Sequence, residues 1–203
     1  MKQELKSMIN ENEKIFWEGK PNKKCFIFET IFNPLMPIAI IWAIIDFGFL
    51  GFSFTANQES NFLWFIIPFF ALHLMPVWMY LGGLFFCIRK YKNTYYIVTD
   101  KAIYTSGGAF TKIFTTKPFA EMSNINLYRG IFDQMFNVGD IICTTDQRDT
   151  NGRTVTINIS SISNYTEVFN IVKKLQQDIY SDIMYPNDMR PRENHGYNTK
   201  YKG

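Results

Sequence analysis

The chain has 203 residues, of which 47% are hydrophobic, and its formal net charge is +3. Between Asp100 and Asp149, acidic residues are about as frequent as basic ones, whereas a nucleic-acid-binding domain carries a basic face with interleaved aromatic residues. No nucleic-acid partner is therefore expected. The length allows one ordinary domain beside an apolar segment. The three cysteines have no paired spacing, so we expect reduced thiols.

Residues 1–30 are expected to form a cytoplasmic N-terminal segment. They are polar up to Lys24 and lack the apolar stretch of a signal peptide. The apolar patch Ile15-Phe16-Trp17 is followed by Gly19 and Pro21, which indicate a turn. Trp17 is expected either at the level of the lipid headgroups or packed against a later domain, and the sequence leaves both open.

Residues 31–90 are predicted to form a transmembrane hairpin of two helices. The apolar runs Leu35–Phe54 and Phe62–Ile88 are each long enough to cross a bilayer core, which needs roughly 20 apolar residues in a helix. A buried hairpin in a soluble protein is the alternative, but a chain of this length could hardly cover two such runs. Pro68 and Pro76 lie inside the second run and predict kinks there.

Basic residues flank the predicted hairpin, and the loop between the runs contains neither Lys nor Arg. Since short loops with Lys and Arg stay in the cytoplasm, the chain is expected to be a multi-pass protein of the inner (cytoplasmic) membrane with both termini cytoplasmic. Each cation at the membrane interface could attract anionic lipid by about 1 kcal/mol, but the ordinary positive-inside bias already explains these cations and is favoured over headgroup specificity. These residues are Lys20, Lys23, Lys24, Arg89, Lys90 and Lys92.

Asp46 and His73 are the only ionisable residues of the two runs. In a hairpin that turns near Gln58, their depths differ by about 4.5 Å. An ionisable group at mid-membrane costs at least about 2.5 kcal/mol and therefore normally faces a partner. An Asp–His hydrogen bond within one chain, or a polar seam between chains, is favoured over a proton or ion relay.

Residues 91–180 are predicted to form an antiparallel β-domain closed by a helix. The pattern indicates six strands, with hairpin turns at Gly107-Gly108 and Asn151-Gly152. Asn164 is expected to cap an amphipathic helix over Tyr165–Tyr180, which would cover one end of a bent sheet or partly open barrel. The predicted fold class is thus an α+β membrane protein. Residues 181–203 are expected to be a disordered tail. The strands are expected at Thr94–Thr99, Ala102–Ser106, Phe110–Lys117, Glu121–Tyr128, Val138–Thr145 and Arg153–Ser160.

The order of these elements resembles the bacterial pleckstrin-homology-like (PH-like) membrane proteins. The resemblance lies in Trp17-Glu18-Gly19-Lys20-Pro21, two membrane helices, and then Tyr95 to Asp100 (YYIVTD). The strand from Ala102 to Gly107, the apolar loop ending in Gly139-Asp140 and the strand Ile141–Thr145 follow in the same order. The resemblance implies a PH-like domain behind a transmembrane hairpin, and it supplies no catalytic residues.

Two departures from the PH pattern matter. A PH fold has seven strands, one more than the sequence pattern predicts here. Phosphoinositide-binding PH domains concentrate Lys and Arg in the first hairpin loop, where this chain has only Lys101 beside Asp100. Headgroup recognition by that loop is therefore not expected.

No enzyme signature is recognisable in the sequence, and no metal or cofactor is expected. His73 lies in an apolar run and His195 in the tail, and Cys143 on a predicted strand is more typical of a core residue than of a nucleophile. The sequence therefore predicts a non-enzymatic scaffold or self-assembly module at the cytoplasmic face of the membrane. Its expected partners are membrane lipids and a protein or a second copy.

The loop between the fourth and fifth predicted strands is a possible contact site. Its apolar residues could dock on a partner or on the membrane, but filling of the barrel interior is favoured. Two other functions remain open: an oligomeric ion- or proton-conducting or transport accessory protein that uses Asp46 and His73, and a regulator that binds anionic lipid. The loop residues are Ile131, Phe132, Met135 and Phe136.

Overall fold

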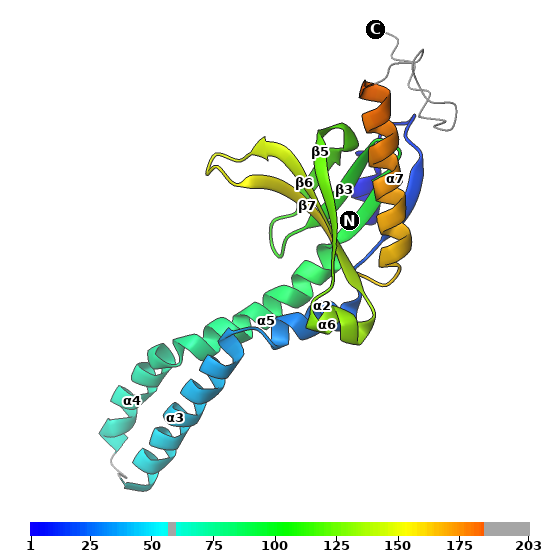
Figure 1. Ribbon diagram of the computed structural model, residues 1–203. Coiled ribbons are helices and arrows are strands. Elements are labelled where there is room, and N and C mark those ends of the chain that lie inside the picture. Colours follow the sequence, from blue (N-terminus) through cyan, green and yellow to red (C-terminus); the bar gives the residue numbers. More distant parts are fainter. Residues whose placement is uncertain (57–59, 185–203) are drawn as a thin grey trace. The chain divides into compact units, whose positions relative to one another are not determined.

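The computed structural model describes residues 1–56 and 60–184 (Figure 1). It consists of two compact units. We call the first the β-domain, formed by Met1–Phe26 together with the chain from Lys90 onward, and the second the helical unit, Ile27–Arg89. The sequence predicted a separate N-terminal segment over residues 1–30, and the structure corrects this. Residues up to Phe26 belong to the β-domain, because this segment supplies a strand to sheet A.

The described part of the β-domain contains two antiparallel sheets, which do not join into a closed barrel. Sheet A has the strand order β1-β2-β3-β4, and sheet B has the order β5-β6-β7. The short helix η1 (Phe119–Glu121) connects them. The strands are β1 (Ile15–Gly19), β2 (Tyr95–Thr99), β3 (Ala102–Gly107), β4 (Ile113–Pro118), β5 (Met122–Tyr128), β6 (Gly139–Arg148) and β7 (Thr154–Ile162).

The strand absent from the sequence prediction is β1. It pairs with β2, although the whole apolar segment of the chain lies between the two strands in the sequence. Trp17 lies opposite Val98 and Gly19 lies opposite Tyr96. The Trp17 side chain packs against the core of the β-domain, so of its two expected positions the structure has the second. A Cβ atom on Gly19 would collide with the indole ring of Trp17, which explains the glycine at this position.

The main core lies between the two sheets and α7 (Tyr165–Met184). Strand residues that point inward meet one apolar side of this amphipathic helix, as alternation in strands and the helical repeat require. The helix ends four residues beyond the predicted Tyr180, so residues 181–184 are not tail, and residues 185–203 lie outside the described residues. The fully buried core residues include Val98, Ile103, Ile141, Cys143, Ile159, Val168 and Val172.

A second, smaller apolar cluster lies on the other face of sheet A, under helix α1 (Lys2–Lys6). Leu5 is fully buried there against Tyr95, Ile97 and Tyr104. Every residue of β2 is therefore buried, since alternate side chains face the main core and α1. Exposed ion pairs surround the contact: Lys2 and Lys6 with Glu18, and Lys112 with Glu4 at 2.7 Å.

The helical unit contains α3 (Leu35–Ala56) and α4 (Ser60–His73), and it shares α2 (Lys23–Ile31) and α5 (Met75–Asn93) with the β-domain. Among the described residues, one helix is long and apolar enough to cross a membrane, over Leu35–Ser53. A second exists only if α4 and α5 together count as one span, because they are bent by 56°.

The second run is bent where Pro76 predicted a kink, since the helix breaks at Leu74 between α4 and α5. Pro76 explains the break: it has no N–H to donate, and its ring would clash with the carbonyl of a preceding helical turn. Pro68, by contrast, lies inside α4 without interrupting it. The Gly107-Gly108 turn is also longer than predicted, because β4 begins only at Ile113, although Gly108 does adopt a positive φ of 95°.

Candidate functional site

One end of the β-domain bears both chain connections to the helical unit, and we call it the connection end. In sheet A it is marked by Gly19 opposite Tyr96 and by the loop between β3 and β4. In sheet B it is marked by the ends of β5 and β7. The backbone N–H of Asn22 donates to the carbonyl of Ser161 at 2.6 Å, which joins the two sheets here. The connection end consists of residues 19–26, 90–95, 107–113, 128–139 and 161–162.

Helix α6 (Ile131–Phe136) lies at the connection end and is held firmly in place. The buried carboxylate of Asp133 accepts a hydrogen bond from the Gly130 N–H at 2.8 Å and one from the Cys25 thiol at 3.6 Å. Arg129 donates from Nε to the carbonyl of Val138 at 2.8 Å, and its guanidinium lies 4.5 Å from the centre of the Tyr165 ring. Both ends of this short helix are therefore fixed.

The sequence favoured filling of a barrel interior by the apolar residues of this loop, but in the structure two of them, Ile131 and Met135, are exposed. Ile131 is 84% exposed and Met135 is 58% exposed, while Phe132 and Phe136 are half-buried. The loop between β3 and β4, which the sequence did not single out, also exposes large apolar side chains at this end: Phe110 at 64% and, at the start of β4, Ile113 at 56%. Asn93 anchors that loop by donating from Nδ2 to the Gly108 carbonyl at 2.9 Å.

The predicted interface lysines of the β-domain also lie at the connection end and are exposed. Lys20 donates to the backbone carbonyl of Lys92 at 3.4 Å, and its ammonium lies 5.8 Å from the centre of the Tyr91 ring. Lys23 and Lys24 begin α2, which Asn22 caps by accepting from the N–H of Lys24 at 3.0 Å. Lys90 and Lys92 lie in the last turn of α5, whereas Arg89 is the last residue of the helical unit.

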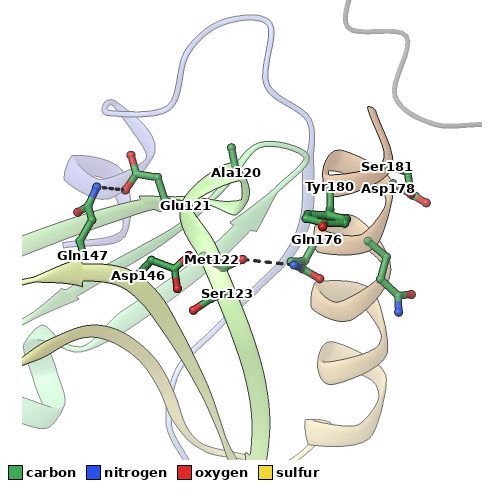
Figure 2. Close-up of a pocket in the computed structure, with 11 residues that line it drawn as sticks. Ala120, Glu121, Met122, Ser123, Asp146, Gln147, Gln176, Asp178, Tyr180 and Ser181 are labelled. Carbon is green, nitrogen blue, oxygen red and sulfur yellow. Dashed lines mark hydrogen bonds between the residues drawn. The ribbon is translucent and has the colours of Figure 1, made fainter. Parts of the chain in front are cut away.

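A groove lies at the opposite end of the β-domain, between η1, the start of β5, β6 and the last turns of α7 (Figure 2). Its volume is about 840 Å³. Gln176 donates from Nε2 to the Met122 carbonyl at 3.3 Å and so occupies part of the edge of β5 (Figure 2). No local sequence signal marks this site, because four separate elements form it. It is lined by Ala120, Glu121, Met122, Ser123, Asp146, Gln147, Gln176, Gln177, Asp178, Tyr180 and Ser181.

The groove is acidic. Glu121, Asp146 and Asp178 contribute carboxylates, and no lysine or arginine is among its lining residues. Glu121 is partly neutralised by Lys117, whose ammonium lies 3.8 Å away, and it accepts a hydrogen bond from the Gln147 amide at 3.1 Å. A cationic ligand would therefore suit this groove better than an anionic one.

In the helical unit, the structure brings Asp46 and His73 together within one chain. Asp46 Oδ1 lies 2.9 Å from His73 Nδ1, and Asp46 is only 2% exposed. Trp42 donates from its indole N–H to the His73 carbonyl at 2.8 Å, and Phe49 meets Phe70 with ring centres 6.0 Å apart. These contacts show that α3 and α4 run antiparallel.

The three thiols of the chain are buried. Cys25, Cys87 and Cys143 are all buried and form no disulfide. Burial raises the pKa of the Cys143 thiol to about 12, so its thiolate, which is the nucleophilic form, is scarce at neutral pH. The Cys143 side chain acts as a small apolar residue of the core.

Comparison with known proteins identifies a family. A family model described as "Bacterial PH domain" matches residues 26–176, about three quarters of the chain. The match includes the apolar helices, strands β2 to β7 and more than half of α7, but it begins after β1. No curated protein and no solved structure matches the chain.

Proposed function

The chain belongs to the bacterial PH domain family, and on this premise we propose that it is a membrane-anchored, non-enzymatic scaffold. The helical unit anchors it as a two-span hairpin in the inner membrane, and the β-domain binds a protein partner or a second copy at the cytoplasmic face. PH-like domains are generally non-catalytic, which agrees with the absence of a recognisable enzyme signature in the sequence.

The exposed apolar surface of α3 is the observation that carries the anchoring. Large apolar side chains along it are mostly exposed, such as those of Ile41, Ile44, Phe47 and Phe52. The helix has no lysine or arginine and only one carboxylate, so little charge makes this surface soluble. A water-soluble protein rarely exposes so large an apolar patch, whereas lipid covers it without cost. The bent pair of α4 and α5 supplies the second span, and the flanking lysines keep both termini in the cytoplasm.

The groove beside α7 is the contact surface we assign to the scaffold. It lies at the end of the β-domain away from the chain connections, and it borders the edge strand β5, whose carbonyl at Met122 accepts a hydrogen bond from Gln176. A partner segment that carries lysine or arginine could pair with that edge and meet the carboxylates.

Site-specific photo-crosslinking in native membranes tests this assignment. A photoreactive amino acid replaces Gln177, an exposed lining residue of the groove, or Thr150, an exposed residue of the β6–β7 turn that serves as the matched control. We expect a discrete crosslinked species from position 177 and none from position 150. The Asp178→Lys substitution should abolish it. Equal labelling from both positions, or labelling that survives the charge reversal, contradicts the groove as the contact surface.

The Asp46–His73 pair favours a second candidate, an oligomeric ion or proton conduit or a transport accessory protein. About two fifths of the His73 side chain is exposed while it holds a buried carboxylate, so a second copy could contact it. Two spans per chain can enclose a conducting path only as an oligomer. Native mass measurement in detergent distinguishes the two functions, since a strict monomer removes this candidate but leaves a scaffold for other proteins intact.

A further inference from the structure

We propose that the connection end of the β-domain is itself a peripheral contact with anionic lipid, in which α6 and the β3–β4 loop enter the membrane interface and the lysines bind headgroups. This inference rests on the membrane anchoring of the proposed function. It adds a surface and a ligand class that the anchor alone does not require, because a tethered domain could equally stay clear of the lipid.

Chain connectivity brings this end within reach of a membrane that holds α3. The Cys25 thiol contacts Asp133 of α6, and α3 begins at Leu35, ten residues later (35 − 25). Ten residues span at most about 35 Å when fully extended, and the distance is shorter here because most of these residues are helical in α2. The second connection also keeps this end close to the apolar helices, because Asn93 at the end of α5 donates a hydrogen bond to the β3–β4 loop.

The apolar side chains at this end are presented by anchored backbone. Ile131 and Met135 project from a helix that Asp133 and Arg129 hold at both ends, and Phe110 follows the glycine that Asn93 holds. Single exposed apolar residues are ordinary on protein surfaces. Here they gather at one end on two separate elements, and little ordering entropy is lost when they insert, because the backbone is already fixed.

The charge at this end complements anionic headgroups. In the part of the chain that the structure describes, the ammonium groups of Lys20, Lys23, Lys24, Lys90 and Lys92 form no ion pair. Two carboxylates at this end are engaged inward: Asp133 caps α6, and Asp140 accepts from the Ser161 N–H at 2.6 Å. The acidic groove lies at the other end, so the two ends of the β-domain differ in charge and favour one orientation over an anionic surface.

Full-length protein in lipid nanodiscs provides the test. Ile131→Cys, Phe110→Cys, Thr150→Cys or Ile44→Cys introduces one exposed cysteine, which is labelled with an environment-sensitive dye, while the three native cysteines are buried. Nanodiscs contain phosphatidylcholine alone or with added phosphatidylglycerol. With phosphatidylglycerol, we expect a blue shift and quenching by headgroup-level spin-labelled lipid at positions 131 and 110, and neither effect at position 150.

Charge variants test the headgroup contact. Each lysine near an anionic surface contributes about a fivefold preference, so the K23Q/K24Q variant should lower the ratio of docked to undocked domain by roughly 25-fold. The matched control is K173Q on the exposed surface of α7, which should leave the ratio unchanged.

The label at Ile44 in α3 separates the two proposals. Deep quenching at position 44 without quenching at positions 131 and 110 overturns the lipid contact and leaves the anchor standing. Absence of quenching at position 44 by lipid spin-labelled deep in its acyl chain overturns the anchor itself. Equal quenching at position 131 with and without phosphatidylglycerol overturns the preference for anionic lipid.

Discussion

Replacing Leu5 with alanine should release α1 from sheet A. Leu5 is fully buried on the outer face of that sheet, whereas the ion pairs around it are exposed and contribute little. Leu-to-Ala changes in rigid cores cost roughly 3–5 kcal/mol, but a five-residue helix at the surface can shift into the space left, so we expect about 2–3 kcal/mol. Undocked α1 should then become roughly 30- to 150-fold more populated.

Limited trypsin digestion in detergent measures this population. Cleavage after Lys6 requires α1 to leave the sheet, because Lys6 pairs with Glu18 in the docked form, and its rate follows the open fraction when reclosing is fast. Met8→Ala is the matched control, since Met8 is an exposed apolar residue of the same segment, and its cleavage rate should change little. A Leu5→Ala rate close to that of the wild-type chain would refute the view that burial of Leu5 holds α1.

Three further outcomes follow from other contacts. The Lys112 ammonium lowers the pKa of Glu4 to about 2, and the Lys2 ammonium lowers the pKa of Glu18 below its ordinary value. These pairs therefore contribute fully above the ordinary carboxyl pKa, and the contribution is lost as the pH falls toward 2. Hydrogen exchange of residues 1–9, corrected for intrinsic rates, should rise over that window. The Asp133→Ala change removes a cap worth about 0.5–2 kcal/mol and should accelerate exchange in α6 without altering α7. Asp46→Leu and His73→Leu should each lower the unfolding free energy of the helical unit by about 1–3 kcal/mol, measured by denaturation in mixed micelles, and should impair assembly in detergent. The double variant should lower that free energy by less than the sum of the two single changes.

The strands after residue 94 and α7 were predictable because their patterns are local. Alternating side chains marked most of the strands, and Asn151-Gly152 lies in the β6–β7 turn, where Gly152 has a φ of 75°. Asn164 precedes α7 as expected, and its carbonyl accepts the first helical bond from Val168 at 3.1 Å. These features need only a few neighbouring residues, so the sequence contains the whole signal.

The parts that the sequence did not reveal depend on distant pairing. The groove needs η1, β5, β6 and α7 to meet, and no single segment anticipates that. One signal for the covered face of sheet A was nevertheless present: the run Tyr95–Thr99 is apolar without alternation, which indicates a strand buried on both faces. Such a strand demands cover on both faces. The main core covers one face, and α1, from the start of the chain, covers the other.

The composite β-domain leads to a last prediction about where the folding unit begins. Residues 90–184 alone lack the strand that pairs with the outer edge of β2 and the helix that covers Tyr95, Ile97 and Tyr104. Each large apolar side chain left uncovered costs about 1.5–3 kcal/mol, and the loss of Leu5 and Trp17 with their contacts approaches the 5–15 kcal/mol that typically stabilise a domain.

Residues 90–184 should therefore fail to give a cooperative thermal transition by circular dichroism, whereas residues 1–24 joined ahead of them by a short glycine-serine linker should restore it. Trp17→Lys in the joined chain is the matched control and should abolish the gain, because Trp17 packs into the main core from β1. A sharp transition of residues 90–184 at the same temperature as the joined chain would mean that β1 is dispensable and that the domain begins after the apolar helices.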